Sequence, residues 1–259
     1  MRMMKKVLGT VTVLALSVSL LAGCGSTAAS PVSSAASTAA ENTTSSVVPE
    51  TTFAAADENE AAAAQLLNDL TGSYQELWPV ILADEYKQTW LDDCTALVGE
   101  DNAEAAFEKL SSMVTGDVYG EDAVKAYANG GGAYFCGFTN SLATLTFDGE
   151  TSTISGTDKD GNVLFSHTYH YIGMEPVRGL YEFQSDDADS GEFTYFFLAP
   201  DTSAETYHIE FRYGSDAEAL SQYDTGEYAY WLASGISTDC DQTMIDNCIE
   251  LFCTENLAG

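Results

Sequence analysis

The sequence predicts an α+β protein in which an antiparallel β-barrel is flanked by N-terminal and C-terminal helices. Apolar residues recur at three- and four-residue spacings before residue 130, which indicates helices. From 131 to 214, aromatic and β-branched residues alternate with short clusters of turn residues, which is typical of strands, and helical spacing returns between 215 and 259. Because the strand candidates are short and joined by tight turns, we expect a closed or nearly closed barrel.

The helical part that leads into the barrel spans residues 57–130. An acidic start at Asp57 runs into Leu66, Leu67 and Leu70, and Gly72 gives the stop signal for this first helix. Further apolar residues between 78 and 97 keep mostly three- and four-residue spacings. We therefore expect mainly helices before the barrel.

Seven strands are predicted for the barrel, and short helices follow them. The strand candidates are residues 133–138, 142–147, 151–155, 162–171, 178–184, 192–198 and 206–213. Residues 216–223 favour a short helix, and Asp239 precedes a second helix with Ile245, Cys248 and Ile249 on its apolar side.

The first residues have the order of a bacterial lipoprotein signal peptide. Basic residues within the first six positions precede an apolar run that ends in LAGC, so we expect residues 1–23 to be removed and Cys24 to be lipidated. Residues 24–56 are mostly Ser, Thr and Ala and predict a flexible tether. The folded domain then spans 57–259 and lies on the extracytoplasmic face of the cell membrane.

Charge and hydropathy limit the classes of partner. The chain carries a net charge of −31, which excludes nucleic acid and attracts cations, although the same charge also serves solubility. Beyond the signal peptide, no apolar segment is long enough to cross a bilayer. We therefore expect the lipid on Cys24 to be the only contact with the membrane.

Five cysteines remain after lipidation, and an odd number leaves at least one of them unpaired. In a C-terminal helix, Cys240 and Cys248 would lie about 12 Å apart, beyond the roughly 7 Å Cα separation that a disulfide allows. Any disulfide is therefore expected to reach Cys94 or Cys136.

His208 and Glu210 are the candidate metal ligands. Thr206, His208 and Glu210 occupy alternate positions of one strand candidate, so they share a face, and a His beside a carboxylate suits a divalent metal ion. His167 and His170 are three apart on another strand, so a regular strand does not bring both to one metal. The alternative interpretation is that His208 forms a hydrogen bond inside the barrel while Glu210 faces water.

Other motifs that carry chemistry are incomplete. Residues 158–162 and 186–191 resemble calcium loops but lack the remaining oxygen ligands, so we expect hairpin turns. Motifs of hydrolases, zinc proteases and phosphate-binding loops are absent from the sequence. We expect a binding protein rather than an enzyme, with no catalytic residues.

The order of motifs resembles the ZinT/YodA-type zinc-binding domain, a calycin-like (lipocalin-like) barrel. The resemblance covers roughly residues 72–249 and rests on YQELWP (74–79), VKAY (124–127), YHYIG (169–173), RGLYEF (178–183), FLAP (197–200), TYHI (206–209) and GS (214–215). In that family three histidines hold zinc, and the matching positions here read Phe196, Thr206 and His208. The resemblance therefore implies the barrel and a degenerate metal site.

Two functions follow as expectations from this resemblance. In the first, the lipoprotein binds zinc or another divalent metal ion through His208 with Glu210, and Glu205 if the strand is bulged, as an accessory to a metal ABC importer. In the second, a degenerate calycin module binds a small apolar ligand or a protein partner without metal, since Phe196 replaces a ligand and aromatic residues fill the strands.

Overall fold

The barrel is closed and built from eight strands. In the computed structural model, which describes residues 51–201 and 203–258, each strand pairs antiparallel with the next along the chain, and β1 also pairs with β8. This confirms the predicted α+β class with an antiparallel barrel. The strands are β1 (Gly72–Glu76), β2 (Thr144–Asp148), β3 (Thr153–Thr157), β4 (Val163–Met174), β5 (Tyr181–Ser185), β6 (Tyr195–Leu198), β7 (Ile209–Gly214) and β8 (Ala233–Ser237).

The strands that close the barrel differ from the prediction. β1 and β8 lie in the parts of the chain predicted to be helical, so the barrel extends from residue 72 to residue 237 rather than from 131 to 214. Residues 133–138 form no strand, and Phe135 makes only isolated bridges to Thr115 and Trp231. β1 and β8 acquire their conformation by pairing with each other across the closure of the barrel.

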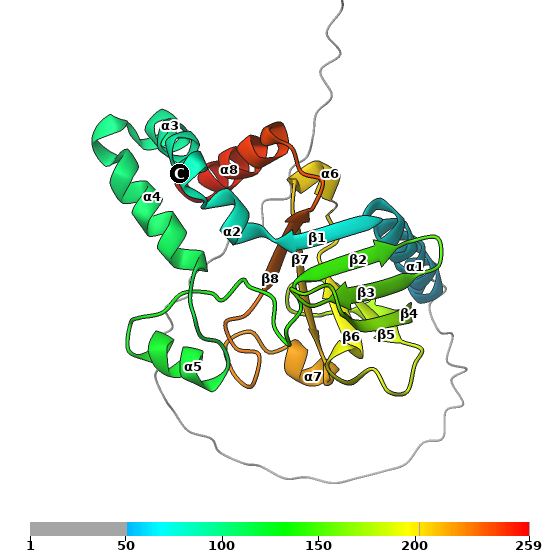
Figure 1. Cartoon of the computed structure of the whole chain (residues 1–259). Coiled ribbons are helices and arrows are strands. Elements are labelled where there is room, and N and C mark those ends of the chain that lie inside the picture. Colours follow the sequence, from blue (N-terminus) through cyan, green and yellow to red (C-terminus); the bar gives the residue numbers. More distant parts are fainter. Residues whose placement is uncertain (1–50, 202, 259) are drawn as a thin grey trace, which may run out of the picture. The chain divides into compact units, whose positions relative to one another are not determined.

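Helices lie on both sides of the barrel (Figure 1). α1 (Thr51–Asp69) packs against β2 and β4, while α2 (Leu77–Ile81), α3 (Lys87–Val98), α4 (Glu100–Val114) and α8 (Gln242–Leu257) gather beside β1 and β8. The remaining helical segments are short: η1 (Asp84–Tyr86), α5 (Glu121–Ala128), η2 (Gly191–Phe193), α6 (Ser203–Thr206) and α7 (Ala217–Leu220). α7 and α8 begin at the aspartate caps Asp216 and Asp241, whose carboxylates accept backbone N–H groups.

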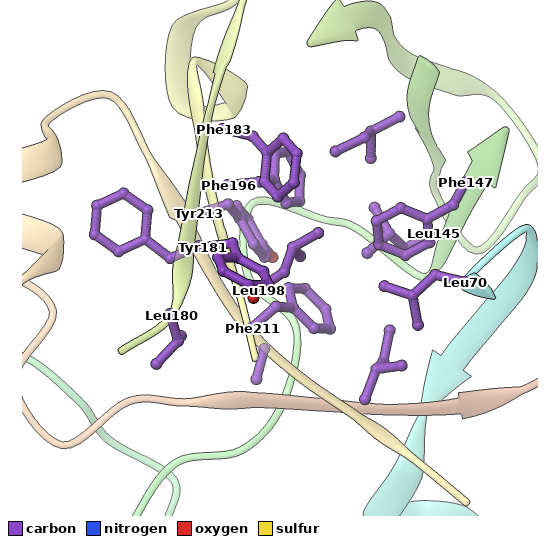
Figure 2. Packing of buried hydrophobic residues seen from close by; sticks show 14 of the residues in the cluster. Leu70, Leu145, Phe147, Leu180, Tyr181, Phe183, Phe196, Leu198, Phe211 and Tyr213 are labelled. Atoms are coloured by element: carbon purple, nitrogen blue, oxygen red, sulfur yellow. The ribbon is translucent and has the colours of Figure 1, made fainter. Parts of the chain in front are cut away.

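Aromatic side chains fill the barrel (Figure 2). Phe183, Phe196 and Phe211 are each no more than 1 % exposed and belong to one cluster, which also contains Phe147 from β2 and Leu70 at the end of the first helix. A second cluster joins α2, α3, α4 and α8. These buried side chains occupy the interior of the barrel and form its core.

The start of the chain lies mostly outside the described residues. The predicted signal peptide (1–23), Cys24 and residues 25–50 of the tether are in this part. α1 begins at Thr51, so the last six residues assigned to the tether are helical and the first helix starts before Asp57. In the described ranges no helix combines the length and apolar character needed to cross a membrane.

Gly149, in the turn between β2 and β3, is where the barrel meets α1. A Cβ there would lie 2.6 Å from the Leu67 carbonyl oxygen and would also collide with the backbone of Asn68. We expect Gly149→Ala to lower the free energy of unfolding by about 1–3 kcal/mol, because the helix backbone must move.

The measurement is urea denaturation, with Gly131→Ala as the control. The added Cβ at Gly131 would find its nearest neighbour, the Ala126 carbonyl oxygen, at an ordinary 3.6 Å. Equal midpoints for the two variants would show that α1 does not pack tightly on this turn.

Candidate functional site

His208 precedes β7 rather than lying within it. α6 ends at Thr206, Tyr207 adopts a positive φ of 66°, and β7 begins only at Ile209. The predicted strand over 206–213 is therefore wrong in its first three residues. The left-handed conformation of Tyr207 interrupts the alternation of side chains that a regular strand would produce. His208 and Glu210 nevertheless face each other, with Nε2 of His208 3.9 Å from Oε1 of Glu210.

The turn around Tyr207 holds the His208 ring in one orientation. Nδ1 of His208 donates to the Thr206 carbonyl oxygen at 2.7 Å, and the Thr206 hydroxyl donates to the His208 carbonyl oxygen at 2.8 Å. Since a carbonyl oxygen only accepts, Nδ1 carries the proton, and Nε2 faces Glu210. A backbone carbonyl that fixes the tautomer is the usual partner of a metal-binding histidine.

The surroundings of the His208 ring favour a positive charge. Its side chain is only 18 % exposed, and burial lowers its pKa. A hydrogen bond with Cys248 and the charge of Glu210 outweigh burial and raise the pKa from 6.5 to about 10. The Glu210 charge that favours a proton on Nε2 also attracts a metal cation that replaces the proton.

Two residues of α8 complete this site, and neither was assigned to it from the sequence. Cys248 is buried and forms the hydrogen bond with His208, and Glu255 interacts electrostatically with both His208 and Glu210. Both are about forty positions from His208, so no local spacing links them to it. Glu205, considered as a further carboxylate, lies on α6 and is exposed.

The donor set fits a weak metal site rather than a tight one. Phe196, at one position where the resemblance implies a ligand, is fully buried in the aromatic core, and Thr206 offers a hydroxyl where imidazole is implied. Over residues 51–201 and 203–258, no group of three or more His, Cys, Asp or Glu side chains is arranged to hold a metal ion. His208 and Glu210 would thus bind zinc with water in the other positions.

The other two histidines are held apart from this site. His167 Nδ1 lies 2.8 Å from Oδ2 of Asp187, and His170 Nδ1 lies 2.6 Å from Oδ1 of Asp186. These contacts tie the loop after β5 to β4, and this loop connects the paired strands β5 and β6, as the predicted hairpin turn requires. At the other turn, Asp158 accepts the backbone N–H groups of Asp160 and Asn162.

A surface groove lies on the side of the barrel near β1. Its volume is about 300 Å³, and its lining includes Trp78, Leu82, Val114, Phe135 and Cys136. Neither His208 nor Glu210 lines it. The groove is therefore separate from the candidate metal ligands.

Comparison with known proteins finds similarity among solved structures but none in sequence searches. No protein-family model and no curated protein matches the sequence. Among solved structures, the Zn(II)-bound ZinT-like domain of AdcA from Streptococcus pneumoniae is 15 % identical over 71 % of this chain and 89 % of its own, with a TM-score of 0.45. Zn(II)-bound AdcA from the same organism is 14 % identical over 70 % of this chain, with a TM-score of 0.42.

This chain spans about a third of the full AdcA structure, since the match covers 34 % of that chain. The strand pairing by itself establishes the closed eight-stranded barrel. The protein is thus an α+β protein built on a closed eight-stranded antiparallel barrel.

Proposed function

We propose that this chain is an extracytoplasmic, lipid-anchored protein that binds a divalent metal ion, zinc foremost, weakly through His208 and Glu210. The observation that carries the proposal is the fixed His208 ring, whose Nδ1 donates to the Thr206 carbonyl oxygen while Nε2 faces Glu210. The negative surroundings that raise the pKa of His208 favour any cation at Nε2. The net charge of −31 adds a general attraction for cations.

The biological role that follows is a binding one, not catalysis. A two-ligand site exchanges its metal readily, because water fills the remaining positions and leaves them open to a second protein. Such a site suits an accessory that concentrates a metal ion near a metal ABC importer and passes it on. Lipidation of Cys24 would keep the domain at the membrane where the importer works.

Calorimetric titration of zinc into metal-free protein tests the proposal. We expect saturable one-to-one binding at micromolar concentrations, and His208→Ala should weaken it by at least about 100-fold, because it removes the imidazole ligand. Glu210→Ala should weaken it by about tenfold. His170→Ala and Glu205→Ala are matched controls, since both residues are exposed and lie outside the pair.

Weak, salt-sensitive zinc binding that none of the four substitutions changes would contradict the proposal. The acidic surface alone would then be collecting cations. Binding lost equally in the control variants would also contradict it.

A second candidate function is a module that binds a small apolar ligand or a protein partner without metal. The groove lined by Trp78, Leu82 and Phe135 favours it, because it presents apolar side chains at the surface. Trp78→Ala would abolish such binding and leave zinc binding intact, which separates the two candidates.

A further inference from the structure

Cys94 on α3 and Cys253 on α8 face each other inside the helical cluster. Their sulfur atoms are 3.9 Å apart, and both residues are fully buried although 159 positions separate them in the chain. α3 and α8 pack against each other and lie next to each other in Figure 1. A disulfide requires an S–S distance of about 2 Å, so the two sulfur atoms must move closer together to form the bond.

The other described cysteines have different neighbours. The Cys136 thiol lies 3.9 Å from the Tyr134 carbonyl oxygen, and Cys248 forms a hydrogen bond with His208. Cys240 is partly exposed at the start of the C-terminal region. All five described cysteines are free in this structure. Of the two cysteines that the sequence offered as disulfide partners, Cys94 is therefore the one with a sulfur atom beside it.

We propose that Cys94 and Cys253 form a disulfide bond in the exported protein and thereby cross-link α3 to α8. The inference rests on the proposed extracytoplasmic location, where disulfides persist. The oxidant is the disulfide of an exported thiol–disulfide oxidoreductase. One cysteine thiolate attacks that disulfide and releases one oxidant thiolate, and the second cysteine thiolate then displaces the other. The two cysteines lose two protons and two electrons, and the oxidant becomes a dithiol.

The bond must form while the chain folds. Burial raises the pKa of Cys94 and of Cys253, so the folded protein holds little of the reactive thiolate. Neither sulfur is accessible to an oxidant once α8 has packed on α3. Oxidation before that packing step, or after local opening of α8, is therefore the available route.

The cross-link also supports the candidate metal site. α8 carries Cys248 five positions before Cys253 and Glu255 two positions after it, and both interact with His208. A bond from Cys253 to α3 holds this stretch of α8 against the rest of the domain. The oxidised protein therefore keeps Cys248 and Glu255 beside His208, and reduction loosens this part of α8.

Mass mapping of the full chain tests the pairing. Protein isolated from the membranes of bacterial cells is denatured without reductant, alkylated and digested. We expect a peptide containing Cys94 linked to one containing Cys253, two hydrogen masses below the sum of the free peptides, with Cys136, Cys240 and Cys248 alkylated. A linkage between other cysteines would overturn the proposal.

A refolding experiment distinguishes failure of the Cys94–Cys253 pairing from failure of the proposed extracytoplasmic location. Reduced, denatured full chain is refolded in a glutathione redox buffer and mapped in the same way. Failure to form the bond there would overturn the pairing in any compartment. A bond that forms in this buffer but is missing from protein isolated from cells would instead overturn the extracytoplasmic location, and with it the cross-link in cells.

Thermal unfolding provides the second readout. Because the bond closes a loop of more than 100 residues, adding reductant should lower the Tm of the oxidised protein by about 10 °C. Cys94→Ala and Cys253→Ala should remove this response to reductant, whereas Cys240→Ala should retain it. A response that survives in Cys253→Ala would contradict the assignment even if that variant is less stable overall.

Discussion

Replacing Arg212 with methionine is expected to lower the free energy of unfolding by about 3–5 kcal/mol. Arg212 lies on β7 and is fully buried. Its guanidinium donates to the carbonyl oxygens of Leu220, Gln222 and Tyr228 and stacks over the ring of Tyr223 at 4.3 Å. Methionine fills much of the volume but removes the donor of three carbonyl groups, of which those of Leu220 and Tyr228 belong to buried residues.

Within the described part of the chain, carbonyl dipoles and aromatic rings compensate the charge of Arg212, and no carboxylate forms an ion pair with it. Burial lowers its pKa, but an arginine starts so high that it stays charged at neutral pH. Since one side chain connects β7 to the end of α7 and to the segment that leads into β8, its loss should loosen the closure of the barrel as well as the local loop.

Urea denaturation followed by fluorescence measures the effect. Arg212→Lys should recover only a small part of the stability, because one ammonium group does not reach three diverging carbonyl groups. Lys125→Met is the control: Lys125 contacts Asp122 at 3.0 Å on the surface, and its loss should have little measurable effect. Unchanged stability in Arg212→Met would show that apolar packing replaces the polar network without cost.

Zinc affinity is expected to increase about 100-fold between pH 6 and pH 8. Because the pKa of His208 is raised to about 10, its Nε2 is protonated throughout this range, and zinc must displace that proton. Below the pKa, each unit of pH then changes the affinity about tenfold. Calorimetry in buffers of different ionisation enthalpy should report the release of about one proton per zinc ion.

The matched variant is Glu210→Gln, which keeps the shape of the side chain and removes its charge. Without that charge the pKa of His208 falls, so the pH dependence of any remaining zinc binding should become shallower. An affinity that does not change between pH 6 and pH 8, or a proton count near zero, would show that His208 is not the ligand.

The same pKa shift gives the metal-free protein a definite pH dependence. A histidine whose pKa is raised on folding stabilises the folded state fully below its unfolded pKa of 6.5, and this contribution declines as the pH rises toward 10. Wild type should therefore lose more stability than His208→Gln over this range in zinc-free urea titrations.

The sequence by itself determined the class of the fold and most of its elements. Residues 163–171, 181–184 and 195–198 carry the aromatic and β-branched alternation of strands, and each lies within an observed strand. The aspartates before α7 and α8 predicted both helices. The N-cap of α8 is Asp241, however, and not Asp239. Local patterning suffices for these elements because each buries its own apolar face.

Closure of the barrel was decided only by tertiary structure. β1 reads GSYQE and β8 reads ASGIS, and neither contains the run of large apolar residues that marks a strand. They are strands because their backbone groups pair with each other and with β2 and β7. The segment 133–138 has the composition of a strand but finds no continuous partner, so it stays irregular.

In the candidate site, too, the sequence determined one contact and the tertiary structure decided the others. His208 and Glu210 are two positions apart, so their proximity could be predicted from the sequence, although the turn at Tyr207 rather than a regular strand produces it. The contact of Cys248 with His208 and that of Cys94 with Cys253 depend on how α8 packs against the barrel and against α3. Contacts between segments 40 to 159 residues apart come from burial of whole helix faces, which no local spacing encodes.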